Sequence, residues 1–66
     1  MRMEEFKSIL KTRKISQREL ARMTGMNRNT LGSKMSCHRP FNVDEARVIS
    51  DALNLSASVR GYIFLT

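Results

Sequence analysis

The stretch that decides the fold spans residues 16–31 and reads SQRELARMTGMNRNTL. Ser16 can cap a helix, and Glu19, three residues later, can bond back to it in a capping box. Gly25 stands where this helix needs a left-handed residue to end, a conformation that glycine adopts without a clash at Cβ. Asn27 can then cap a new helix. The stretch therefore predicts two short helices joined by a tight turn.

The two expected helices, 17–23 and 28–35, are arranged by small residues as well as by caps. Ala21 lies four residues before Gly25, and its small side chain lets two helices approach closely at a steep angle. This is the layout of a helix-turn-helix, whose second helix enters the DNA major groove. We therefore expect a helix-turn-helix over residues 17–35.

The same stretch resembles the DNA-binding domains of bacteriophage Cro and repressor proteins, the XRE-type helix-turn-helix family. The resemblance rests on the spacing of these residues: Gln17, Leu20, Ala21, Gly25, Met26 and Leu31. It extends over most of the chain and is strongest over residues 16–35. It implies a lambda-repressor-like all-α domain and a sequence-specific regulator of transcription that binds double-stranded DNA. The function that it favours is a Cro-like phage repressor that binds palindromic operators as a dimer.

Further helices are expected on both sides of this motif. Residues 3–13 carry apolar side chains at helical spacing and form the first helix. Asn42, with Glu45 in the capping-box position, begins a fourth helix that ends near Asn54. Ser56 can cap a short fifth helix, although a glycine inside it weakens the prediction and leaves an extended C-terminal segment as the alternative.

Length and composition fit one small domain, residues 1–66, built as a compact bundle of about five short helices. The net charge is +6, and the excess is concentrated in residues 1–39, which hold ten Lys and Arg against three Asp and Glu. Such a basic part favours binding to a polyanion, although excess cations can also simply solubilise a small domain. Together with the helix-turn-helix pattern, the charge favours DNA.

The composition also argues against several other classes of protein. The single cysteine, Cys37, excludes an internal disulfide, and no Cys/His set has the spacing of a metal site. No apolar run approaches the ~20 residues of a membrane span, and the N-terminus lacks the apolar core of a signal peptide. We therefore expect a cytoplasmic protein, in a bacterial cell or a phage-infected host, without a cofactor, metal or small-molecule ligand. An enzyme is not expected, since no nucleophile–base pair or carboxylate pair stands out.

The residues predicted to contact base edges lie in the first two turns of the second motif helix: Arg28, Asn29, Gly32 and Ser33. Arg28 offers the fork that matches guanine O6 and N7, and Asn29 offers the amide that matches adenine N7 and N6. Ser33 can read either base less selectively. A solvated surface arginine is the alternative for Arg28. For Gly32 we favour close approach to DNA, and the alternative is that it avoids a clash with a neighbouring helix.

A second set of residues is predicted to contact DNA phosphates: Gln17, Asn27, Thr30, Lys34 and Arg39. The resemblance implies that Gln17 bonds a phosphate and braces the second motif helix. The free N–H groups and positive dipole end of a helix N-terminus support that role, and an ordinary polar residue in a first turn is the alternative. Asn27 is also the expected helix cap. Arg39 is the strongest candidate in the basic loop that follows the motif.

The C-terminal tail, residues 57–66, is expected to supply a dimer interface through Tyr62, Ile63, Phe64 and Leu65. These apolar side chains are more than a small monomer is expected to bury, and an exposed apolar patch commonly marks an interface. One alternative is that the tail closes the core over the first and fourth helices. Another is that the chain is an antitoxin-type interaction module that neutralises a protein partner and regulates its own synthesis.

Overall fold

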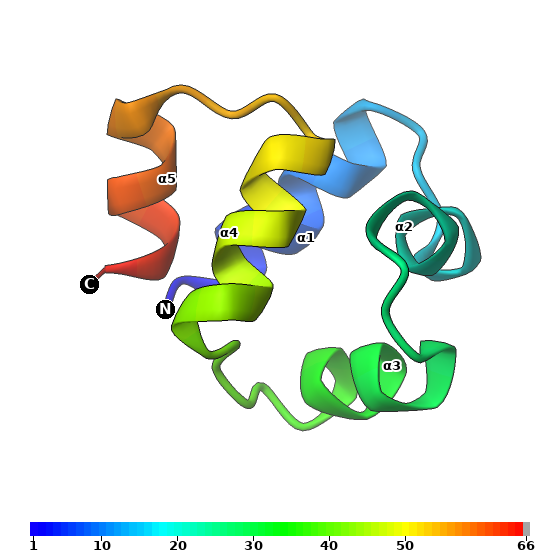
Figure 1. The fold of residues 1–66 in the computed structure, drawn as a ribbon. Helices are drawn as coiled ribbons and strands as arrows, with labels where there is room; N and C mark the ends of the chain where they lie inside the picture. Colours follow the sequence, from blue (N-terminus) through cyan, green and yellow to red (C-terminus); the bar gives the residue numbers. More distant parts are fainter. Residues whose placement is uncertain (66) are drawn as a thin grey trace.

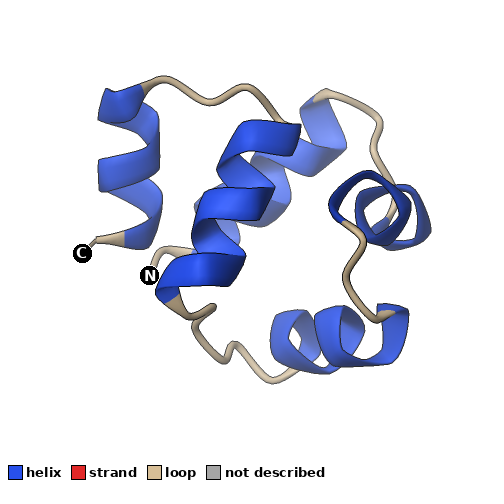
Figure 2. Cartoon of the chain, in the orientation of Figure 1, coloured by secondary structure: helices blue, strands red, loops and turns tan. Residues whose placement is uncertain are grey.

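The computed structural model describes residues 1–65, which form five helices and no strand (Figures 1 and 2). In chain order the helices are α1 (Met3–Thr12), α2 (Gln17–Thr24), α3 (Arg28–Ser36), α4 (Val43–Ala52) and α5 (Ala57–Phe64). The predicted all-α fold with a helix-turn-helix is confirmed. The last residue of the predicted tail, Thr66, lies outside the described residues.

Side-chain caps begin four of the five helices, as predicted. The Ser16 hydroxyl accepts a hydrogen bond from the Glu19 N–H at 3.1 Å, and the Ser56 hydroxyl does the same for α5. At α4 the capping box is complete, since Asn42 Oδ1 accepts from the Glu45 N–H at 2.8 Å and Glu45 Oε1 accepts from the Asn42 N–H at 2.9 Å. The box predicted at α2 is only half formed, because the Glu19 carboxylate pairs with a guanidinium one turn further along.

Left-handed residues end four of the helices. Gly25 has φ of 72° at the end of α2, as its position predicted. Lys14, His38 and Asn54 also have positive φ, just after α1, α3 and α4. At each of these three ends a backbone N–H reaches back to a carbonyl five residues earlier, as in Arg39 N–H to Lys34 O at 2.8 Å. Asn54 was an expected stop, whereas Lys14 and His38 were not.

The core lies where all five helices meet. Its fully buried large side chains are Phe6, Leu20, Leu31, Ile49, Leu53 and Ile63. The rings of Phe6, Phe41 and Phe64 pack with centroids 5.6 to 6.5 Å apart, which joins α1, the α3–α4 loop and α5. The extended alternative for the C-terminal segment is wrong, because α5 is helical through Phe64 and packs on α1. The tail thus contributes to closing the core.

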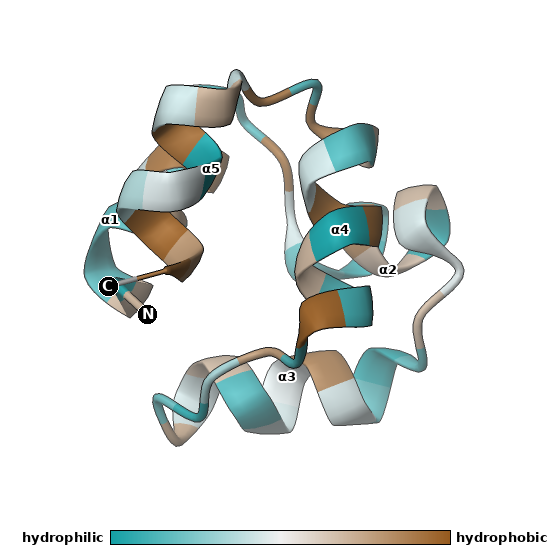
Figure 3. Ribbon diagram, turned by 60° about the vertical axis from the view of Figure 1, so that its left-hand side comes forward, coloured by the Kyte–Doolittle hydropathy of each residue, from teal (hydrophilic) through white to brown (hydrophobic). Residues whose placement is uncertain are grey.

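The packing leaves α3 at the edge of the molecule. Helix α2 packs against both α3 and α4, whereas direct contacts between α3 and α4 are sparse. In Figure 1, α2 is seen almost end-on and α3 lies across it at a steep angle, along the lower margin. Figure 3 shows the same helix at the margin from another side, with hydrophilic residues along much of it. This arrangement gives α3 one face on the core and one face outward.

Candidate nucleic-acid interface

The outward face of α3 begins with the cap that starts the helix. Asn27 Oδ1 accepts hydrogen bonds from the backbone N–H groups of Asn29 at 2.8 Å and Thr30 at 3.1 Å. This cap satisfies two N–H groups of the first turn that have no partner within the helix. Leu31 is fully buried and Met35 is nearly so, which sets the inward face one to two turns later. The first turn of α3 is therefore capped at its start and is followed by side chains that pack in the core.

Three of the four residues predicted to contact base edges lie on that outward face. Arg28, Asn29 and Ser33 are exposed, and so is Thr30, which was predicted to meet phosphate. Nothing in the described residues ties the Arg28 guanidinium into an ion pair or hydrogen bond. The arrangement offers a guanidinium fork, an amide and a hydroxyl on one side of a short helix. Those are the groups that major-groove readout uses.

Gly32 faces α2 rather than open solvent. A Cβ placed on this residue would lie 3.0 Å from Gln17 Oε1, closer than ordinary van der Waals contact. Gly32 is also half-buried. The structure thus supports the alternative for this glycine: the missing side chain makes room for the neighbouring helix. The close approach to DNA that we favoured is not what the contacts around Gly32 indicate.

Gln17 stands at the first position of α2, beside α3. It is exposed, and its amide oxygen lies where it would be 3.0 Å from a Cβ placed on Gly32 of α3. The first N–H groups of α2 lie at the same end of the helix, where they can donate to an anion. The geometry therefore brings a helix N-terminus, an exposed amide and one side of α3 close together.

The remaining predicted phosphate contacts divide into two groups. Asn27 and Arg39 are exposed, although the carboxamide oxygen of Asn27 is occupied by the cap. Arg39 lies in the α3–α4 loop, anchored through its backbone N–H to Lys34 O. Lys34 itself does not face outward: its side chain is 23% exposed and forms an ion pair with Glu45 of α4.

Two arginines outside the two predicted sets of DNA contacts have structural roles. Arg13 donates from Nη1 to the carbonyl of Leu53, which ties the end of α1 to the end of α4. Arg22 pairs with Glu19 on the exposed side of α2. The hydrogen bond from Arg22 lowers the pKa of the Glu19 carboxyl below its usual value. Neither role leaves a signature in the local sequence beyond the i, i+3 spacing of the second pair.

The residues predicted for a dimer interface are not equally available. Ile63 is 1% exposed and belongs to the core, so it must be withdrawn as an interface residue. Phe64 is partly buried against Phe6. Tyr62 is 48% exposed, with the Arg2 guanidinium 4.4 Å from its ring centroid, and Leu65 is 80% exposed. The free apolar surface of the tail is thus smaller than the sequence suggests.

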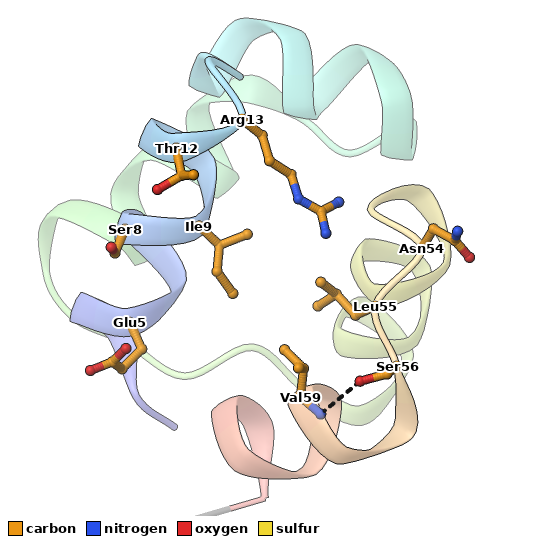
Figure 4. A pocket seen from close by; sticks show the side chains of 9 residues that line it. All are labelled: Glu5, Ser8, Ile9, Thr12, Arg13, Asn54, Leu55, Ser56 and Val59. Carbon is orange, nitrogen blue, oxygen red and sulfur yellow. Dashed lines mark hydrogen bonds between the residues drawn. The ribbon is translucent and has the colours of Figure 1, made fainter.

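A surface groove of about 470 Å³ lies away from α3, between α1, the α4–α5 connection and α5 (Figure 4). Ile9, Leu55 and Val59 give it an apolar lining, and Arg13 lies at one end. Among the described residues no three His, Cys, Asp or Glu side chains gather as they would to hold a metal ion. No helix in this part of the chain has the length and apolar character needed to cross a membrane.

Comparison with known families agrees with the geometry. A sequence model of the Cro/C1-type HTH DNA-binding domain matches residues 5–58, which covers most of α1, all of α2, α3 and α4, and the start of α5. Neither a curated protein nor a solved structure gives a match. The matched segment includes the capped turn between α2 and α3 and every residue placed on the outward face of α3. The chain belongs to the Cro/C1-type helix-turn-helix family of DNA-binding proteins.

Proposed function

We propose that this DNA-binding protein is a Cro-like repressor that reads palindromic operators through the major groove as a dimer. The observation that carries the proposal is the first turn of α3. It is capped by Asn27, backed by buried Leu31, and presents Arg28 and Asn29 outward at the margin of the molecule. A helix end of this kind can enter the groove without other parts of the protein meeting the duplex first.

Base readout is assigned to three side chains of α3. Arg28 donates two hydrogen bonds to guanine O6 and N7, and Asn29 pairs with adenine N6 and N7. Ser33, one turn further along, contacts a neighbouring base with less selectivity. Gly32 is left out of this set because its contact is with Gln17. Substitutions in the set should change which sequence is preferred.

Phosphate contacts hold the helix in register. We assign them to Gln17 with the N-terminus of α2, to Arg39 in the α3–α4 loop, and to the exposed polar groups of Asn27 and Thr30. Gln17 precedes α3 in the helix-turn-helix, Asn27 and Thr30 belong to its cap and first turn, and Arg39 follows it in the chain. Contacts to phosphates supply affinity and orientation but do not distinguish sequences.

A dimer is proposed because a single α3 contacts only a short stretch of DNA. One α3 covers only a few base pairs, whereas two copies on a two-fold axis, about 34 Å apart, read two half-sites on one face of the duplex. Leu65 and Tyr62 are the exposed side chains of the predicted interface. Bound at an operator in the cytoplasm of a bacterial or phage-infected cell, such a dimer represses by blocking polymerase.

The antitoxin alternative is not favoured. The family match is to a DNA-binding domain, and the burial of Ile63 and Phe64 leaves the tail less surface for a protein partner.

Selection of bound duplexes from a random pool tests the proposed function. The expected result is an inverted repeat with half-site centres separated by about 10 base pairs and a guanine within each half-site. Enrichment of a single, non-repeated half-site contradicts the dimer. Failure to enrich any sequence over the starting pool contradicts sequence-specific regulation altogether.

A further inference from the structure

An ion pair joins the end of the recognition helix to the start of the next helix. Lys34 Nζ in the last turn of α3 donates to Glu45 Oε1 in the first turn of α4. The two side chains are only 23% and 19% exposed. Lys34 Nζ also lies 5.8 Å from the centroid of the Phe41 ring, which is buried. The lysine is therefore enclosed by α4 and its preceding loop instead of projecting toward solvent.

The carboxylate that receives Lys34 is itself fixed by the capping box. Glu45 Oε1 accepts from the Asn42 N–H at 2.9 Å, and Asn42 Oδ1 accepts from the Glu45 N–H at 2.8 Å. Burial of the Glu45 carboxyl raises its pKa, but the hydrogen bonds from Lys34 and from Asn42 lower it by more, so that the net shift is downward. One oxygen thus serves both the cap of α4 and the contact with α3.

The pair also suits the two helix ends that it joins. A cation is favoured at the C-terminal end of a helix and an anion at the N-terminal end. Lys34 and Glu45 occupy those positions in α3 and α4. Because the two helices make few other direct contacts, the pair is a direct side-chain link across the loop that separates them.

We propose that Lys34 and Glu45 form a positioning pair that sets the pose of α3 and keeps one cation away from DNA phosphate. This inference rests on the proposed function. Lys34 then acts through Glu45 instead of contacting a phosphate, which replaces the role predicted for it from sequence. Withholding this charge lowers sequence-independent binding, while fixing α3 favours the correct site. The pair therefore raises discrimination between operator and other DNA.

The test compares Lys34→Gln and Glu45→Gln with two controls, Asp44→Asn and Lys34→Arg. Asp44 is the exposed acid directly before Glu45, so its neutralisation raises the net charge as much as Glu45→Gln does, without touching the pair. Affinity is measured for the selected operator and for a scrambled duplex over a range of salt concentrations. The slope of log K against log salt reports how many phosphates are neutralised, at about 0.9 per contact. A merely structural defect does not predict a gain in this slope.

The expected result differs for each side of the pair. Lys34→Gln leaves the slope unchanged, whereas Glu45→Gln releases the lysine and increases the slope by about 0.9 per protomer. Both variants lower the operator-to-scrambled affinity ratio by roughly three- to tenfold, a range typical of coupling between contacting residues. Asp44→Asn leaves this ratio unchanged, and Lys34→Arg keeps it close to wild type.

Two results overturn the proposal. A slope that falls by about 0.9 per protomer in Lys34→Gln places this lysine on a phosphate. An unchanged affinity ratio in both Lys34→Gln and Glu45→Gln removes the positioning role. Melting curves identify variants that are unfolded at the assay temperature. If Lys34→Gln is one of them, the affinity ratio and the salt slope of Glu45→Gln test the proposal.

A measurement without DNA separates this proposal from the proposed function. NMR titration of the Glu45 carboxyl should show its pKa rise when Lys34 becomes Gln. If that rise is seen but the wild-type protein prefers no duplex, the pair exists and the repressor function fails. If no rise is seen, Lys34 and Glu45 do not form the proposed pair, whatever the DNA measurements give.

Discussion

At position 25, the backbone conformation alone explains the preference for glycine. Its φ is 72°, yet no heavy atom lies within 4 Å of the place where a Cβ would stand. The cost of a side chain here comes from the left-handed conformation and not from crowding. Gly25→Ala should therefore lower the free energy of unfolding by about 1 kcal/mol, and Gly25→Asn by less, because asparagine tolerates this region. Urea denaturation measures both, and a loss for Gly25→Asn as large as that for Gly25→Ala would contradict the conformational explanation.

Arg28 is the residue on which sequence preference should depend most. Arg28→Ala is expected to cost about 1–3 kcal/mol of operator affinity and to relax the preference at one position of each half-site. Arg18→Ala, which removes an exposed arginine of α2, is the matched control for loss of charge. Fluorescence anisotropy on operator and on operators altered at single positions gives both values. An equal loss on operator and scrambled DNA would make Arg28 a phosphate contact.

At this scale the sequence predicts residues whose partners are close in the chain. The caps at Ser16, Asn27 and Asn42 and the left-handed Gly25 are confirmed because each depends on backbone within four residues. Gly32 and Lys34 were assigned to DNA because their true neighbours, Gln17 and Glu45, lie 15 and 11 residues away. Only the packing of α2 and α4 brings those partners close. The spacing of polar residues within one helix cannot reveal its contacts with other helices.

At the scale of elements, the Lys34–Glu45 pair predicts a dependence of stability on pH. The pKa of Glu45 in the folded protein lies below its ordinary value of 4.5, so the unfolded state binds more protons in between. The stabilisation is complete above the ordinary value and is lost as pH falls through the folded-state pKa. Glu19 also has a lowered pKa, but its pair with Arg22 is exposed and contributes little.

Melting curves between pH 7 and pH 3 measure this effect. The midpoint of the wild-type protein should fall on acidification below pH 4.5, and that of Glu45→Gln should fall less. Asp44→Asn is the control, because it removes an acid of the same turn of α4 that lies outside the pair. Identical acid profiles for wild type and Glu45→Gln would mean that the pair adds nothing to the stability of the fold.

The bounds of the helices were largely predictable, but the left-handed residues that follow two of them were not. Periodicity and caps place α1, α2 and α3 to within one residue at either end. Lys14 and His38 nevertheless take the left-handed conformation that sequence patterns reserve for glycine or asparagine. In both cases the N–H of the next residue donates to the carbonyl five residues earlier. This hydrogen bond and the packing of the following segment hold the residue there. Such a constraint comes from the tertiary structure and has no local signal.

At the scale of the whole molecule, the C-terminal tail contributes to the core and also to the proposed dimer interface. The apolar run of residues 59–65 predicted burial and association together, but the sequence could not say which side chain serves which purpose. The helical form of α5 settles the core positions, since Ile63 points inward and Leu65, just past the helix, is 80% exposed. An extended tail would have divided the same residues differently.

Leu65→Ser should weaken the dimer on DNA while leaving the fold of the protomer nearly unchanged. The side chain is 80% exposed, so little burial is lost within the protomer. Val43→Ser is the matched control, because this valine of α4 is 74% exposed and lies outside the tail. In titrations of a two-half-site operator, the Leu65 variant is expected to lose cooperativity, and the Val43 variant to keep it. Equal cooperativity for both would remove the tail from the interface.

Protection of guanine N7 from methylation tests most directly whether the first turn of α3 lies in the major groove, because this atom is exposed only there. With wild-type protein on the selected operator, we expect one protected guanine per half-site opposite Arg28. With Arg28→Ala at saturating concentration, that guanine should become reactive again while ethylation interference at the flanking phosphates persists. Unchanged protection in the variant, or protection confined to adenine N3 in the minor groove, would contradict the account.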